Sequence, residues 1–349
     1  MKKILPALLL VSLCTLMVYS QSTGTGRPRV VVQPTATPEV PAPLMPIEPP
    51  PSLIIEDDEE IRIDTNLVTL PVSVLDREGR FIGGLDQADF DIYENGAKQQ
   101  IEYFASLEKP FTVVLLIDVS PSTKYKIDEI QDAAIAFVSE LRPQDSVIVA
   151  SFSRDFTILS QNKRSYHRIR RDIRKAQFGD GTSLYQAIDH ALENLLKPIE
   201  GRKALVLFSD GVDTTSRGPN FRSTLEKIEA FDSLVYPIRY NTFDESQVNP
   251  NPNYVYPVGS SPMENARGKE YLTRLSELSG GRMYEAENAQ NLDAAFRSIA
   301  EELRRQYSIG YYPDIVGKNG DRKNIRVLVK KPNLTVRTKN SYIVSTNDD

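Results

Sequence analysis

The chain has 349 residues, of which 40% are hydrophobic and 26% are charged, a balance typical of a soluble globular protein. Its formal net charge is −5, so no general excess of positive charge favours nucleic-acid binding. One cysteine and two histidines leave little material for disulfides or for a metal site built from sulfur and nitrogen ligands. The length allows one large domain and a smaller one.

The first twenty residues have the pattern of a signal peptide. Two lysines precede an apolar run at residues 4–19, and Ser20 completes a small-residue cleavage site. An uncleaved membrane span is the alternative, but the run is shorter than the roughly 20 residues that a bilayer requires. Cleavage would remove Cys14, which is also a poor site for lipid attachment because the bulky Leu13 precedes it. We therefore expect a secreted, periplasmic or cell-envelope protein with no membrane span after cleavage.

Residues 21–60 have the composition of a linker. The stretch PTATPEVPAPLMPIEPPP is rich in proline, which favours an extended, semi-rigid chain of about 3 Å per residue. The acidic run EDDEE, residues 56–60, closes it. A spacer is the main interpretation, and a docking segment is the alternative.

Residues 61–108 predict the first part of a β-domain. Apolar residues recur at every second position over residues 68–74, which is the period of a half-buried strand. The stretch DFDIYENGAKQQIEYF, residues 89–104, predicts a hairpin, because the pair Asn95-Gly96 readily adopts the positive φ angles of a tight turn. So few strands make a weak core by themselves.

Residues 109–304 alternate strands with helices. The continuous apolar run at residues 111–117 predicts a buried strand, and residues 127–141 carry apolar side chains at helical spacing. Further strands are predicted at residues 146–152, 156–159, 204–208, 234–238 and 283–286, and further helices at 166–176, 184–196, 221–231, 271–278 and 291–305. This order predicts an α/β fold with a doubly wound, mainly parallel sheet covered by helices on both faces.

Residues 305–349 predict strands again, at 307–313, 324–330 and 334–344. Neither this part nor the earlier strand-rich part can bury its apolar face alone. We therefore expect the two parts to form one small β-sandwich-like domain around the α/β domain. The last predicted helix runs into the following strand without glycine or proline, so the connection either transmits movement of the helix or is a fixed joint.

Oxygen-bearing side chains gather at the edge of the sheet where ligands bind in open α/β folds. The strand that ends in LLID delivers Asp118, and Ser120 and Ser122 follow at two-residue intervals. The loop GDGTS delivers Thr182, and the strand LVLFSD delivers Asp210. Neither cysteine nor histidine accompanies them. Hard oxygen donors of this kind favour Mg²⁺ or Mn²⁺.

A cation would also explain a carboxylate at the end of a buried strand. An isolated charge is costly there, and a bound metal ion would compensate the charge of Asp118. Neutral hydroxyl ligands leave such an ion electrophilic, so a carboxylate from a partner is a natural additional ligand. The alternative is that Asp118 and Asp210 merely cap helices and loops.

With these residues the chain resembles the von Willebrand factor type A domain. The metal-ion-dependent adhesion site of that family is D-x-S-x-S with a distant Thr and a distant Asp, and all five positions have counterparts in this chain. The resemblance covers roughly residues 111–303. D-x-S-x-S alone is a weak signal, but its combination with a strand end, GTS and SDG is a strong one. The flanking stretches VTLPVSVLDREG and QYSIGYYP also resemble a bacterial secreted subgroup of the family.

The resemblance implies a Rossmann-like fold and a role for each site residue. Ser120 and Ser122 would coordinate the ion directly, whereas Asp118 and Asp210 would bind it directly or through water. Thr182 would change between direct and water-mediated contact as the state of the domain changes.

Two further segments could contact a partner. Residues 163–175 predict a helix with a basic face, which is either solvated or docks on an acidic partner. Residues 241–268 predict an unusually long loop that leaves the carboxyl end of a strand. This loop is either an insertion or a specificity loop that presents Tyr254 and Tyr256.

The sequence favours binding over catalysis. It lacks a nucleophile elbow, an H-E-x-x-H motif, a P-loop and a Rossmann glycine run, and His167 and His190 have no recognisable catalytic partners. We expect an extracytoplasmic, non-enzymatic protein-binding module for adhesion or assembly. It would capture an exposed Asp or Glu of a protein partner through Mg²⁺, with Mn²⁺ as a substitute. The alternative is an accessory subunit of an envelope enzyme or secretion complex. A metal-dependent hydrolase is a weaker third hypothesis, since it needs a base that the sequence does not indicate.

Overall fold

The computed structural model describes residues 67–106, 108–161, 165–242, 248–251, 253–286 and 289–344. All described residues belong to one compact unit, which lies within Arg62–Asp349. The predicted signal peptide and linker lie outside the described residues. Among the helices that the structure describes, none combines the length and the apolar character needed to cross a membrane.

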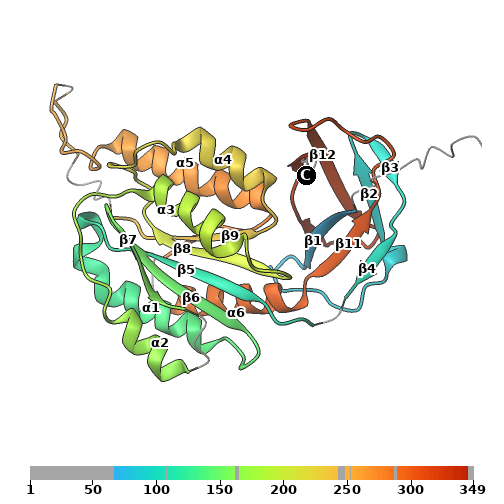
Figure 1. The fold of residues 1–349 in the computed structure, drawn as a ribbon, viewed down its shortest axis with the longest axis horizontal. Coiled ribbons are helices and arrows are strands. Elements are labelled where there is room, and N and C mark those ends of the chain that lie inside the picture. Colours follow the sequence, from blue (N-terminus) through green and yellow to red (C-terminus); the bar gives the residue numbers. More distant parts are fainter. Residues whose placement is uncertain are drawn as a thin grey trace, which may run out of the picture. The chain divides into compact units, whose positions relative to one another are not determined.

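A six-stranded sheet forms the centre of the α/β part (Figure 1). Its strand order is β10-β9-β8-β5-β6-β7, and all neighbours are parallel except β6 and β7. The strands are β5 (Thr112–Asp118), β6 (Ser146–Phe152), β7 (Phe156–Ser160), β8 (Lys203–Ser209), β9 (Leu234–Arg239) and β10 (Tyr284–Glu285). The predicted α/β fold class is confirmed.

Helices cover both faces of this sheet, as Figure 1 shows. One face packs against α1 (Ile127–Ser139), α2 (Tyr166–Ile173) and α6 (Ala289–Arg305). The other packs against α3 (Leu184–His190), which continues as a π-helical turn η3 (Ala191–Leu196), and against α4 (Phe221–Ala230) and α5 (Pro262–Ser279). Successive residues of β5 therefore enter opposite cores, which explains its unbroken apolar sequence.

Two antiparallel sheets enclose a third core, built from chain segments on both sides of the α/β part. Their strand orders are β13-β1-β11-β4 and β14-β12-β2-β3. The elements are β1 (Val68–Leu75), β2 (Phe90–Glu94), β3 (Ala97–Gln99), β4 (Tyr103–Ala105), β11 (Tyr307–Tyr311), β12 (Arg322–Val329), β13 (Thr335–Arg337) and β14 (Ser341–Ile343). Two 3₁₀ turns complete the fold, η1 (Gln87–Asp89) and η2 (Pro121–Lys126). We call this part the sandwich.

The predicted hairpin exists, but it is shorter than expected. Strands β2 and β3 pair around Asn95 and Gly96, whose φ angles are 47° and 87°. The turn therefore has the left-handed geometry that this residue pair favours. The next strand, β4, leaves the hairpin and pairs with β11 in the other sheet. The chain thus changes sheets after Gln99, which strand periodicity alone does not reveal.

Helix α5 begins earlier than predicted, at Pro262 instead of residue 271. Ser261 caps it, because the Ser261 hydroxyl accepts a hydrogen bond from the Glu264 main chain and the Glu264 carboxylate accepts one from the Ser261 main chain. Glycine disfavours a helix, so Gly268 makes this stretch look non-helical in the sequence. In the structure Gly268 is needed for a close packing contact. A Cβ atom on Gly211 would lie 2.3 Å from the Gly268 carbonyl oxygen. The backbones touch there, and only glycine fits.

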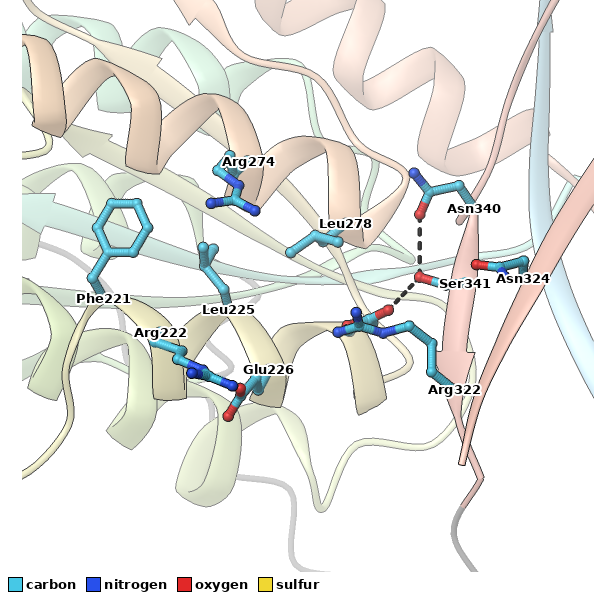
Figure 2. Close-up of a pocket in the computed structure, with 11 residues that line it drawn as sticks. Phe221, Arg222, Leu225, Glu226, Arg274, Leu278, Arg322, Asn324, Asn340 and Ser341 are labelled. Atoms are coloured by element: carbon cyan, nitrogen blue, oxygen red, sulfur yellow. Dashed lines mark hydrogen bonds and ion pairs between the residues drawn. The ribbon is translucent and has the colours of Figure 1, made fainter. Parts of the chain in front are cut away.

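Buried polar contacts join the sandwich to helix α4. The Glu229 carboxylate, on α4, accepts hydrogen bonds from Arg322 and Ser341 of the sandwich. The Lys339 ammonium donates to main-chain carbonyl groups at the end of α4, including that of Glu229 at 3.0 Å. Figure 2 shows Arg322 and Ser341 at the rim of a pocket of about 660 Å³ between α4, α5 and the sandwich.

The end of helix α6 is held by three charged groups. Glu302 is 1% exposed and pairs with Arg337 of the sandwich at 3.2 Å. Arg304 pairs with the buried Asp145 at 3.1 Å. Arg202 donates to the main-chain carbonyl of Gln306 at 2.7 Å, just beyond the helix. Arg202 also donates to the Leu303 carbonyl at 3.3 Å, so it satisfies carbonyl groups at the helix end, and the two ion pairs tie α6 to both parts of the fold.

The Glu302–Arg337 pair gives a first prediction. Arg337→Met leaves a buried carboxylate without its partner, so the free energy of unfolding at neutral pH should fall by about 3 kcal/mol. Arg80→Met is the matched control, because the Arg80 side chain is 75% exposed in its pair with Asp76 and its loss should change the stability far less. Chemical denaturation of both variants measures this. Equal costs would contradict the buried pair.

The same pair predicts a pH dependence. Burial raises the pKa of Glu302 above its usual 4.5, and Arg337 opposes the rise. A raised native pKa means that the folded state binds the proton more tightly, so stability falls as pH rises through this range. Without Arg337 the native pKa rises further. The cost of Arg337→Met should therefore be large at neutral pH and shrink toward about pH 4, where a protonated Glu302 needs no partner. A cost that grows on acidification would contradict this.

The shared core of the sandwich gives another prediction. Ile325 on β12 is 6% exposed and lies opposite Glu94 of β2. Ile325→Ala should cost about 2–5 kcal/mol and should speed hydrogen exchange in β2 and β3. Ile315→Ala, at a residue that is 73% exposed, is the control. Unchanged exchange in β2 would show that the segments after α6 do not stabilise those before β5.

Candidate functional site

Asp118 lies at the carboxyl end of β5 and is fully buried. One carboxylate oxygen accepts a hydrogen bond from the Ser120 main-chain nitrogen at 2.9 Å. The other accepts one from the Ser209 hydroxyl at 2.7 Å. Ser209 is there because β5 and β8 are parallel neighbours that end level with each other. The sheet thus fixes this carboxylate at its edge.

Asp210 follows β8 directly and is 1% exposed. Its carboxylate accepts hydrogen bonds from the Val212 main-chain nitrogen at 3.0 Å and from the Thr242 hydroxyl at 2.7 Å. Two acidic side chains therefore end adjacent strands, both without access to water.

Their proximity has an electrostatic consequence. Burial raises the pKa of Asp118 to about 7, and the negative charge of Asp210 adds to the rise. In the described part of the chain, only neutral donors contact the two carboxylates. A cation between them would relieve both the burial penalty and the repulsion.

Hydroxyl groups complete the first loop. Ser120 is buried, Ser122 is exposed, and their Oγ atoms lie 3.0 Å apart. The Thr123 hydroxyl donates to the Ser120 carbonyl oxygen at 2.8 Å and so fixes the turn that carries both serines. The alternation seen in the sequence therefore places both hydroxyls together beside Asp118.

Thr182 lies on a loop that bridges the ends of the two strands. The Gly179 main-chain nitrogen donates to the carbonyl oxygen of Val119, just after β5. On the other side, the Thr182 carbonyl accepts from the Thr214 nitrogen at 2.8 Å, and the Thr182 nitrogen donates to the Thr214 hydroxyl at 2.9 Å. Gly181 adopts a φ of 67° and packs so closely on Thr215 that a side chain would not fit.

The structure thus places all five predicted ligands on three neighbouring loops at the carboxyl edge of the sheet. Their hard oxygen donors and paired carboxylates fit a hard divalent cation such as Mg²⁺. Sequence reasoning missed Ser209, Thr242 and Thr214. Only Ser209 had a signal, its position before the aspartate in SDG. The assignment of metal ligands stays a prediction.

Other polar groups, including the predicted basic helix and one of the two histidines, make structural contacts. Asp213 accepts a hydrogen bond from the Tyr185 nitrogen at 3.0 Å near the start of α3. His190 packs on the ring of Phe156 at 4.4 Å. On the predicted basic helix, Arg174 pairs with Asp132, so part of its charge is compensated. Residues 162–164 at its start lie outside the described residues.

Comparison with known proteins gives a sequence match for this region. Residues 113–212 match the family model of the von Willebrand factor type A domain. A UPF0353 protein of Mycolicibacterium paratuberculosis is 24% identical over 213 residues, which cover 55% of this chain and 60% of that relative. The chain thus spans 60% of the length of this curated relative.

Solved structures of low sequence identity also match. BatB from Bacteroides thetaiotaomicron is 16% identical with a TM-score of 0.41, over 56% of this chain and 98% of BatB. A von Willebrand factor type A protein from Catenulispora acidiphila is 10% identical with a TM-score of 0.45, over 82% of this chain and 76% of that one. A mussel byssus protein, proximal thread matrix protein 1 with a zinc-occupied MIDAS motif, is 10% identical with a TM-score of 0.43, over 60% and 49% of the two chains.

The family match runs from β5 to just beyond β8 and includes all five predicted ligands on the three loops. The narrower resemblance to a bacterial secreted subgroup stays a prediction. The chain contains a von Willebrand factor type A domain, matched over residues 113–212.

Proposed function

We propose that this protein is an extracytoplasmic binding module that captures an acidic side chain of a protein partner through a divalent cation, Mg²⁺ or its substitute Mn²⁺. The residues that would hold the ion are Asp118, Ser120, Ser122, Thr182 and Asp210. The proposed role is binding and not catalysis. Adhesion to another protein and assembly within an envelope complex would use the same chemistry, and the identity of the partner separates them.

One observation carries the proposal, the burial of two carboxylates at the ends of adjacent strands beside two hydroxyls. Asp118 and Asp210 are at most 1% exposed, and burial, with the repulsion from Asp210 added, raises the pKa of Asp118. A stable fold does not need such a pair, since apolar or neutral side chains would fit there at lower cost. The arrangement becomes favourable when a cation joins it.

The donor set also suits capture of an acidic group. Serine and threonine hydroxyls are uncharged, so the bound ion would keep much of its positive charge. Ser122 is exposed, which places the opening of the site on its side. When bound, the cation would supply the electrostatic attraction, and the three loops would orient the incoming carboxylate.

The metal proposal predicts a specific loss. Mn²⁺ should bind the wild-type protein in titration calorimetry, and Asp118→Asn should abolish binding while the circular dichroism spectrum stays the same. Mg²⁺ at a hundred times its Kd should raise the free energy of unfolding of the wild type by about 2.7 kcal/mol and leave the variant unchanged. In the absence of metal, the variant should be no less stable than the wild type, because it lacks one of the two repelling charges.

Asp180→Asn is the matched control, since Asp180 is an exposed carboxylate two residues from Thr182 and outside the donor set. It should bind Mn²⁺ as the wild type does. Equal binding by the wild type and Asp118→Asn would refute the proposed site. Loss of binding in Asp180→Asn as well would point to general negative charge as the cause.

The extracytoplasmic location rests on the sequence of the first twenty residues and predicts processing. Mass spectrometry of the exported protein should find Gln21 as its first residue. An intact Met1, or a lipid on Cys14, would contradict the proposed location as stated.

A further inference from the structure

The segment between β9 and α5 begins and ends at the proposed metal site. At its start, the Thr242 hydroxyl donates to the Asp210 carboxylate at 2.7 Å. Near its end, Gly259 lies against Thr214, so closely that a Cβ atom would stand 2.9 Å from the Thr214 methyl group. Thr214 in turn holds the main chain of Thr182. Both ends of the segment thus contact residues that position predicted ligands.

The end of this segment has its own hydrogen bonds. The Tyr256 hydroxyl accepts from the Asn249 main-chain nitrogen at 2.8 Å, and its ring meets that of Tyr254 edge-on at 4.9 Å. The Gly259 nitrogen donates to the Glu264 carboxylate at 3.1 Å, which joins the segment to the first turn of α5. These contacts hold residues 254–259 in a defined conformation against Asn249 and the start of α5.

This ordered stretch nevertheless exposes large apolar side chains. Val255, Val258 and Met263 are 86%, 79% and 81% exposed, and Tyr254 is 46% exposed. Single exposed apolar residues are ordinary, whereas these four lie within ten positions of the chain. In Figure 1 the chain before α5 stands out from the helices at the upper left. We call residues 254–263 the arm.

We infer that the arm is the second half of the binding surface, and that it contacts aliphatic side chains of a partner segment whose carboxylate occupies the proposed metal site. The inference rests on the proposed function, which it extends to the kind of partner. The partner segment is extended, with an Asp or Glu and aliphatic residues a few positions away.

The placement of the arm sets this spacing. Val258 directly precedes Gly259, which packs beside the site, and Val255 lies three residues further out. An extended chain advances about 3.3 Å per residue, so the two valines are at most about 10 Å apart. A partner segment lying along the arm therefore places aliphatic side chains two to four residues from its acidic residue. The charged and polar groups at the ion fix the orientation of the segment, and the apolar contacts add affinity that a polar segment would lack.

The test uses two fluorescent nine-residue peptides on the mature protein with Mg²⁺. Both have one central Asp, and the residues two to four positions away are leucine in one and serine in the other. Fluorescence anisotropy should show that the leucine peptide binds about tenfold or more tightly than the serine peptide. The combined variant Val255→Ser, Val258→Ser and Met263→Ser should remove this preference. Its Mn²⁺ affinity should stay that of the wild type.

The matched control is Ile315→Ser with Val316→Ser, because these side chains are 73% and 64% exposed on the sandwich, away from the arm in sequence. This variant should keep the leucine preference. The inference is overturned if the wild type does not distinguish the peptides, if the arm variant keeps the preference, or if the control variant loses it. It is also overturned if sedimentation shows a dimer of the wild type that the arm variant disrupts, since a second copy would then occupy the arm.

A further measurement separates this inference from the proposed function. If EDTA leaves the affinity of both peptides unchanged while the arm variant still removes the leucine preference, the apolar contact with the arm stands, but the metal-dependent function and the placement of the partner carboxylate in the metal site are wrong. If EDTA weakens both peptides and the arm variant changes neither, the metal function stands and the arm inference is wrong.

Discussion

The burial of two like charges at the ends of neighbouring strands is the constraint on which the site depends. β5 and β8 are adjacent and parallel, so Asp118 and Asp210 lie together at one edge, buried from solvent. The folded chain supplies neutral donors to both, from Ser209 and Thr242 and from main-chain nitrogens. These donors orient the carboxylates and reduce the cost of burial without cancelling the charge. The three loops thus surround two buried carboxylates that have only neutral hydrogen-bond donors in the described part of the chain.

Contacts with the sandwich restrain the last helix of the α/β part. Helix α6 enters β11 directly, but its end is fixed by Glu302, Arg304 and Arg202 to groups on both sides of the junction. On the opposite face, Glu229 of α4 is held by the sandwich as well. A helix fixed in this way favours the fixed joint over a connection that transmits movement. Ligand-dependent change would then concentrate in the loops.

Local patterns in the sequence were enough for the fold class and for the positions of the predicted ligands. An apolar run that ends in Asp118 must place that residue at a strand end, and Asn95-Gly96 must make a tight turn. Long-range partners have no such signature. Neither Thr242 nor Arg337 stands near its carboxylate in sequence, so only the fold reveals these contacts. The start of α5 carried a readable capping signal in Ser261 and Glu264, but Gly268 concealed it, because its purpose is a backbone contact made far away in the chain.

The antiparallel pairing of Ala105 with Ser308 bears on how the chain folds during synthesis. About 200 residues separate these partners, and closing a loop of that length in an unfolded chain costs about 5 kcal/mol in entropy beyond a constant. The α/β part removes this cost when it folds first, because the Lys109 nitrogen then bonds the Arg304 carbonyl and brings both ends of the insertion together. Until then β1 and β2 wait without their partners β11 and β12. At roughly 5–20 residues per second, that wait lasts tens of seconds, a period in which unpaired strand edges are open to aggregation.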